Sequence, residues 1–114
     1  DKVVVINFWG SWCPECHVED EDLQLGHDTY RSRDVVFIGA DYLDTETEAA
    51  RYLTRYAITY ANGLDIGQKI STLFRITAAP ETFIIDRNGL VHTVIIGGTT
   101  EAALSQKIEA ALSN

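Results

Sequence analysis

The chain opens on an uninterrupted apolar run rather than an alternating one. Residues 3–8, Val-Val-Val-Ile-Asn-Phe, are mainly β-branched or aromatic, which is typical of a strand buried on both faces in a parallel sheet. A second run of this character covers residues 35–40. Between them, Pro14 suits the first position of a helix and the acidic residues after it suit its positive end, which predicts a helix from about 14 to about 31.

The middle of the chain continues this order with shorter elements. Asp44 or Thr45 can cap a helix that runs to Tyr56. Residues 58–60 are expected to form a short strand, and Asn62-Gly63 a turn. A further short helix is predicted over 66–74, and its inward-facing residues are expected to be Ile70, Leu73 and Phe74.

The last third of the chain predicts a hairpin and a closing helix. Strands are expected over 82–85 and 90–96, because Asn88-Gly89 between them is a strong hairpin signal. Thr99 or Thr100 can cap the final helix. The apolar residues that recur in this helix every four positions are Leu104, Ile108 and Leu112. The whole pattern predicts an α/β fold with a mixed central β-sheet flanked by helices on both faces: an N-terminal βαβ, a helical insert and a C-terminal ββα.

Composition narrows the class of protein further. The 114 residues, 46% of them hydrophobic, suffice for one domain over 1–114 with its own core. Acidic residues outnumber basic ones 17 to 9, and the resulting formal charge of -8 argues against nucleic acid or an anionic membrane surface as a partner. No apolar run approaches the roughly eighteen residues that a membrane span needs. The residues also suggest no cofactor.

Both cysteines of the chain lie in one motif, Cys13-Pro14-Glu15-Cys16. Residues i and i+3 at a helix start are close enough to form a disulfide. The positive helix end stabilises a thiolate and should lower the pKa of Cys13, which makes Cys13 the predicted nucleophile. Cys16 would then attack the mixed disulfide that Cys13 forms with a partner. Glu19, three residues beyond Cys16, is the predicted general base for Cys16.

Three segments together resemble the TlpA, ResA and DsbE (CcmG) thiol-disulfide oxidoreductases of the thioredoxin superfamily. They are Asn-Phe-Trp-Gly-Ser-Trp-Cys-Pro-Glu-Cys over 7–16, the acid at Glu19, and Ala-Pro-Glu-Thr-Phe-Ile-Ile-Asp over 79–86 with Asn88-Gly89. The resemblance covers nearly the whole chain and implies a thioredoxin-like fold. Asn7 stands where thioredoxin has a buried acid, which points to the extracytoplasmic branch.

The resemblance also implies a substrate-binding surface on both sides of the cysteines. It makes Pro80 a cis proline that faces them, with the backbone of Ala79 receiving an extended substrate segment as an added strand. Glu81 matches the DsbE form of this loop, where an acid influences partner choice. The residues expected to contact substrate next to the disulfide are Trp12, Pro14 and Glu15.

The implied function is dithiol-disulfide exchange with protein substrates outside the cytoplasm, as a periplasmic reductant in cytochrome c maturation. Apocytochrome c would be a substrate, and a membrane thiol-disulfide protein would supply electrons. We expect a monomer. The family's extra N-terminal segment is absent from these residues, so we also expect a domain trimmed at its N-terminus whose missing part carries any membrane anchor.

The motif is also compatible with other functions. A disulfide-forming oxidant, a redox-sensing module or a peroxidase of the related redoxin group would also use a reactive cysteine. Cys13-x-x-Cys16-His17 matches the c-type haem attachment pattern, with His27 or His92 as a second iron ligand. The buried strands on both sides of the motif disfavour a small helical cytochrome. A zinc site would need a second close pair of ligands, so no metal is expected.

Overall fold

A five-stranded mixed sheet in the order β3-β2-β1-β4-β5 organises the computed structural model, which describes residues 1–113. The strands are β1 (Val3–Trp9), β2 (Val35–Asp41), β3 (Ala61–Leu64), β4 (Glu81–Ile85) and β5 (Val91–Ile96). The α-helices are α1 (Pro14–Tyr30), α2 (Glu46–Arg55), α3 (Lys69–Leu73) and α4 (Glu101–Leu112), and 3-10 turns occur at η1 (Arg31–Arg33) and η2 (Ile66–Gln68). The apolar run at the start of the chain is the central strand, as its composition predicted.

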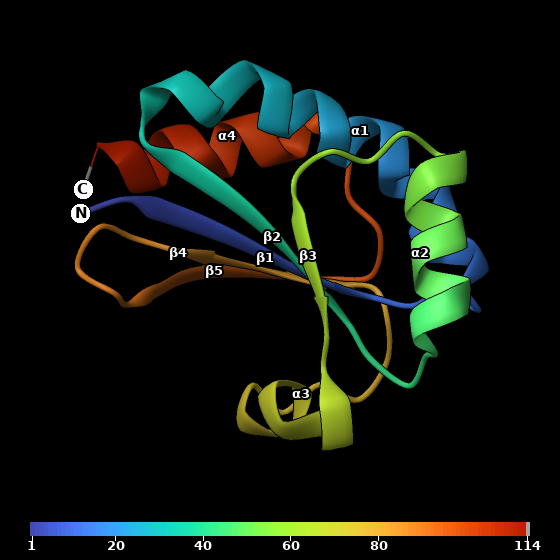
Figure 1. Ribbon diagram of the computed structural model, residues 1–114. Helices are drawn as coiled ribbons and strands as arrows, with labels where there is room; N and C mark the ends of the chain where they lie inside the picture. The colour runs from blue at the N-terminus through green and yellow to red at the C-terminus, as the bar shows by residue number, and fades with distance from the viewer. Residues whose placement is uncertain (114) are drawn as a thin grey trace.

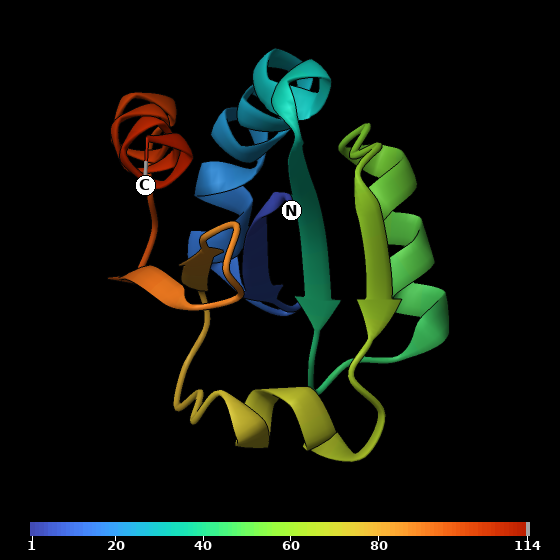
Figure 2. The same ribbon diagram turned by 90° about the vertical axis from the view of Figure 1, so that its left-hand side faces the viewer.

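The strand directions give the predicted N-terminal βαβ and C-terminal ββα. β1 pairs in parallel with β2, and β2 in parallel with β3. β4 runs antiparallel to both β1 and β5. α1 and α4 lie side by side on one face of the sheet, while α3 lies below the opposite face and α2 stands beside β3 (Figures 1 and 2). Helices therefore flank both faces, which confirms the predicted fold class.

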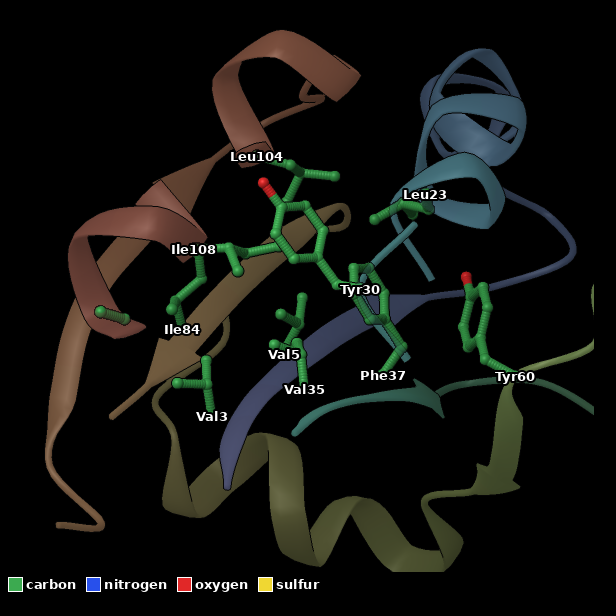
Figure 3. Packing of buried hydrophobic residues seen from close by; sticks show 11 residues of the cluster. Val3, Val5, Leu23, Tyr30, Val35, Phe37, Tyr60, Ile84, Leu104 and Ile108 are labelled. Atoms are coloured by element: carbon green, nitrogen blue, oxygen red, sulfur yellow. The ribbon is translucent and has the colours of Figure 1, made fainter. Parts of the chain in front are cut away.

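The main core fills the space between the sheet and the pair α1 and α4 (Figure 3). Its aliphatic and aromatic side chains are almost completely excluded from solvent. They come from the sheet as Val3, Val5, Val35, Phe37 and Ile84, and from the helices as Leu23, Tyr30, Leu104 and Ile108. A smaller cluster on the opposite face joins Phe8 and Phe83 to Phe74, which follows α3. This packing fixes β1 and α1, the two elements that carry the cysteine motif.

Two of the predicted helix caps are present. The side-chain oxygen of Thr45 accepts a hydrogen bond from the Glu48 N–H at the start of α2. Thr100 accepts one from the Ala103 N–H at the start of α4. A hydroxyl at this position satisfies a backbone donor that the helix itself leaves free.

The predicted strand over 58–60 and the turn at Asn62-Gly63 are wrong. The third strand is Ala61–Leu64, so this Asn-Gly pair lies inside a strand. The pair signals a hairpin only between antiparallel neighbours, whereas β3 pairs in parallel with β2. Asn62 lies opposite Gly39, where an added Cβ would collide with the Asn62 amide and the Trp9 indole. Gly39 therefore lets these two side chains meet.

The predicted helix over 66–74 is divided, and two of its residues face outward. Gly67 and Gln68 have positive φ values of 70° and 57°, which break the helix. The Asp65 carboxylate instead accepts the N–H groups of Ile70 and Ser71. Helix α3 therefore has only five residues and presents one narrow side to the sheet. Phe74 packs inward as predicted, but Ile70 is 45% and Leu73 is 78% exposed.

Truncation of a leucine should lower the free energy of unfolding far more in the core than at an exposed site. Leu104 is fully buried between α4 and the sheet, so Leu104→Ala should lower the free energy of unfolding by about 2–5 kcal/mol. Leu73→Ala removes the same atoms from an exposed site and should change it by less than about 0.5 kcal/mol. Urea denaturation of the oxidised chain measures both values. Equal losses in the two variants would contradict this description of the core.

Candidate active site

A disulfide joins Cys13 and Cys16 at the start of α1, with their Cα atoms 5.3 Å apart. Cys13 is the N-cap residue of the helix, with an extended backbone, and Pro14 occupies the first helical position. The Cys16 N–H donates a hydrogen bond to the Cys13 sulfur over 3.1 Å. The helix start therefore directs a backbone donor at Cys13, as a stabilised thiolate would need after reduction.

The two cysteine residues differ little in exposure but differ in position along the helix. Cys13 is 4% exposed and Cys16 only 1%, and both belong to a buried cluster with Trp9, Ala49 and Tyr52. Cys16 lies one turn further into α1, beneath Cys13. A partner therefore has to approach Cys13 first.

The loop between β1 and α1 is held by contacts within itself and to β2. The Cys13 N–H donates to the Gly10 carbonyl over 3.1 Å. The Trp12 indole folds over Gly10, where an added Cβ would overlap the ring. The Trp12 Nε1–H donates to the Tyr42 carbonyl over 3.1 Å. Although its side chain is 48% exposed, Trp12 is thus fixed beside the disulfide.

Asp44, which follows β2, anchors the same loop and interacts with Asp41 at the end of that strand. The Asp44 carboxylate accepts the Ser11 N–H over 2.7 Å and the Ser11 hydroxyl over 2.8 Å. Partial burial opposes ionisation of Asp44, but these donors outweigh it and lower its pKa. Burial, followed by the adjacent Asp44, raises the pKa of Asp41 to about 8. The raised pKa favours the neutral form of Asp41, which reduces its repulsion of the carboxylate that holds Ser11.

Glu19 lies fully inside the protein, one turn beyond Cys16. It is 1% exposed, and its carboxylate accepts the Asn7 side-chain N–H over 2.8 Å and the Thr99 N–H over 3.1 Å. Burial raises the pKa of Glu19 to about 7, although the two hydrogen bonds oppose the shift. At neutral pH such a carboxyl group can both accept and release a proton, which suits the role that the sequence predicted.

A second buried carboxylate, Asp20, connects α1 to α2. It is 8% exposed and accepts hydrogen bonds from the Tyr52 hydroxyl and from His17 Nδ1, the latter over 3.2 Å. Burial raises the pKa of Asp20 despite these bonds. The His17 ring also lies against Tyr56, with ring centroids 4.1 Å apart. His17 is thus held in one orientation at the edge of the disulfide site.

The segment predicted to face the cysteines does reach them. The Ala79–Pro80 peptide bond is cis, and Ala79 packs against the cluster that contains both sulfurs. Pro80 and Glu81 are buried; Glu81 begins β4 opposite Phe8 of β1 and is 6% exposed. Pro14 and Glu15, by contrast, are exposed on the first turn of α1. Whether these residues contact substrate stays a prediction.

A groove of about 320 Å³ opens beside the disulfide, between the start of α1 and helix α2. We call it the disulfide groove. Cys13 and Pro14 border it from the motif, and the residues of α2 that line it are Glu48, Arg51, Tyr52 and Arg55, with Tyr56 just beyond the helix. The sequence alone assigns none of these α2 residues to the site. Their helical spacing alone gives no indication that α2 lies next to Cys13.

His17, Asp20 and Asp44 were also missed as site residues. The sequence presents His17 as a candidate ligand of haem iron or zinc, and Asp20 as part of an acidic run. The i, i+3 spacing of His17 and Asp20 is compatible with their contact. The Asp44 contact to Ser11 spans 33 positions, so no local pattern reveals it.

A CxxC disulfide at the N-terminus of a helix that follows a central parallel strand defines the thioredoxin-like class of thiol-disulfide proteins. Residues 1–94 match the AhpC/TSA family, and the chain belongs to this family. Among solved structures, it resembles a thioredoxin-family thiol:disulfide interchange protein from Chlorobium tepidum, with a TM-score of 0.85 and 28% identity over 97% of this chain and 80% of the other.

Curated relatives agree with this assignment. The chain is 32% identical over 113 residues to the thiol:disulfide interchange protein HelX of Rhodobacter capsulatus, covering 98% of this chain and 62% of HelX. It is 31% identical over 103 residues to the thiol-disulfide oxidoreductase ResA of Bacillus thuringiensis, covering 90% of this chain and 60% of ResA. The chain thus spans about three fifths of these relatives, and the predicted resemblance to ResA-type proteins is confirmed.

Two further features bear on the alternatives raised above. Within residues 1–113, no cluster of three or more His, Cys, Asp or Glu side chains is arranged to hold a metal ion. In the same part of the chain, every helix is too short or too polar to cross a bilayer.

The buried Glu19 should make stability depend on pH in a defined direction. Its pKa rises from 4.5 to about 7 on folding, so between these values the folded state binds more protons and the free energy of unfolding falls as pH rises. Relative to Glu19→Gln, the native chain should lose up to about 3 kcal/mol from pH 4.5 to pH 8, since one pKa unit is worth about 1.4 kcal/mol.

Denaturant unfolding of both oxidised proteins across this pH range tests the expectation. Glu21→Gln is the matched control, because Glu21 is exposed on the same helix and should leave the pH profile unchanged. A constant difference between the native chain and Glu19→Gln at all pH values would contradict the assigned titration.

Proposed function

We propose that this chain is a thiol-disulfide oxidoreductase that exchanges its Cys13–Cys16 pair with the cysteines of protein partners. The observation that carries the proposal is the disulfide at the start of α1, with the Cys16 N–H donated to the Cys13 sulfur. The names of the HelX and ResA relatives support the same activity.

The reaction begins with the reduced pair. The Cys13 thiolate attacks one sulfur of a partner disulfide; a Cys13–partner bond forms, and the partner's other sulfur leaves as a thiolate that takes up a proton. Cys16 then loses its proton and attacks the Cys13 sulfur, which releases the partner's remaining thiolate. The partner gains two electrons and two protons, while Cys13 and Cys16 become the disulfide of the structure.

Glu19 is the proposed acceptor of the Cys16 proton. It lies one turn beyond Cys16 and has a pKa of about 7, close to the value at which a group transfers protons best at neutral pH. Its two hydrogen-bond donors, Asn7 of β1 and Thr99 in the connection before α4, hold the carboxyl group in place. Direct transfer and transfer through one water molecule are both compatible with this position.

The proposed direction is reduction of partners outside the cytoplasm, during cytochrome c maturation. Apocytochrome c is the proposed substrate, and a membrane thiol-disulfide protein the proposed electron donor. The sequence resemblance to the ResA and DsbE group supports both. The buried Ala79–Pro80 segment and Glu81 are the proposed second side of the substrate site, opposite Trp12, Pro14 and Glu15.

Single cysteine variants test the exchange and its order. Cys16→Ser should accumulate a covalent complex with a disulfide-containing protein such as oxidised insulin, because no resolving thiol remains. Cys13→Ser should form no such complex, since Cys16 lies deeper. Mass spectrometry of the trapped species locates the linked cysteine. Capture through Cys16 would reverse the assigned roles, and a module that merely binds partners would retain full affinity in both variants.

The equilibrium reduction potential tests the direction. A reductant should show a value near or below about -270 mV, that of thioredoxin, whereas a strong disulfide-forming oxidant lies near -120 mV. Equilibration with glutathione or dithiothreitol buffers, followed by alkylation of free thiols, gives the potential. A value near the upper limit would exclude the reductant role and leave the exchange chemistry intact.

A further inference from the structure

The disulfide groove combines positive charge with a reactive sulfur in a strongly acidic chain. Only nine residues are Lys or Arg, against 17 acids, yet Arg51 and Arg55 both border this groove. Arg51 is paired with Glu48 over 3.0 Å. Arg55 has no ion pair among the described residues and lies with its guanidinium carbon 5.4 Å from the Tyr56 ring centre. A cation without an ion-pair partner among the described residues therefore lines the same groove as Cys13.

The geometry of Arg55 leaves its hydrogen-bond donors available. The guanidinium carbon lies over the Tyr56 ring, and among the described residues its N–H groups have no hydrogen-bond or ion-pair partner, so they can bind a carboxylate in a bidentate manner. From α1, His17 also lines the groove, and it is oriented through Nδ1 by Asp20. Within residues 1–113 its other ring nitrogen has no hydrogen-bond partner. The groove therefore offers fixed polar groups that face outward without a protein partner.

The groove is also a route to the nucleophile. Cys13 is only 4% exposed, and it is one of the residues that line the groove. Trp12, which also lines the groove, is fixed by its hydrogen bond to the Tyr42 carbonyl. A partner that brings a cysteine to Cys13 along this path places its neighbouring residues between Trp12 and helix α2.

We propose that the disulfide groove is a specificity subsite for an acidic peptide segment, in which Arg55, assisted by Arg51, binds a carboxylate next to the partner's reacting cysteine. This inference rests on the exchange activity proposed above and names the class of substrate that the site favours. The remainder of the chain, with its large negative charge, repels acidic partners at long range, so the preference depends on these two side chains. High ionic strength should weaken the preference for acidic segments.

The test compares two peptide disulfides with the reduced full chain. They are the disulfide-linked dimers of acetyl-Glu-Cys-Glu-amide and acetyl-Gln-Cys-Gln-amide, which differ only in charge. Stopped-flow tryptophan fluorescence gives the second-order rate constant for each, and the acidic-to-amide ratio of these constants is the readout. In Arg55→Gln this ratio should fall by about threefold at low salt, the effect of one exposed charge pair.

Three further variants distinguish recognition from general damage. Arg51→Gln should lower the ratio in the same direction. Glu48→Gln frees Arg51 from its partner and should raise it, which a loss of structure would not do. Arg31→Gln is the matched control: it makes the same charge change at the opposite end of α1, where Arg31 is exposed and without an ion pair among the described residues, and should leave the ratio unchanged.

The outcomes separate this inference from the function on which it rests. Exchange with both peptides at a ratio that Arg55→Gln does not alter, or that Arg31→Gln alters equally, would overturn the acidic subsite while leaving the oxidoreductase in place. Exchange with neither peptide, together with no trapped complex in Cys16→Ser, would overturn the proposed function and the subsite with it.

Discussion

The hydrogen bond from the Cys16 N–H to the Cys13 sulfur depends on where helix α1 begins, and much of the structure serves to fix that point. β1 delivers the chain from the centre of the sheet, where it has neighbours on both sides. Trp12 and Ser11 tie the connecting loop to the end of β2 through Tyr42 and Asp44. A shift of the helix start by one residue would exchange the reactive position for another side chain. The position of the reactive cysteine therefore depends on contacts with the sheet as well as on the CxxC motif.

Buried carboxyl groups lie near the cysteine motif of this protein. Three carboxyl groups with raised pKa values, Glu19, Asp20 and Asp41, lie inside the protein around the loop and the first turns of α1. Glu19 accepts hydrogen bonds from Asn7 and Thr99, whereas Asp20 accepts them from Tyr52 and His17. Asn7, where thioredoxin has an acid, donates to Glu19 instead. In this protein the buried acid is therefore Glu19 on helix α1, which is closer in sequence to Cys16 than position 7 on β1 is.

Sequence patterns predicted the elements that depend on local chemistry or on long apolar runs. The two buried strands, the capped helices α2 and α4 and the hairpin before α4 followed from side chains within a few positions of one another. β3 and α3 did not, because β3 is specified by its pairing with β2 and by the Asn62 contact to Trp9, and α3 by the Asp65 cap. Within the site, the cysteines and Glu19 were found from spacing on one helix. The residues that α2 contributes to the groove were not found, since only the folded chain brings Arg55 and Cys13 to the same groove.

The near-complete burial of the Cys13–Cys16 pair has a consequence for the shape of its partners. A cysteine fixed on the rigid surface of a folded domain would meet Trp12 and helix α2 before its sulfur reached Cys13. A cysteine on a flexible, extended polypeptide segment can pass between Trp12 and helix α2. For the exchange proposed above, this burial favours a partner cysteine on an extended segment of a chain that has not yet folded.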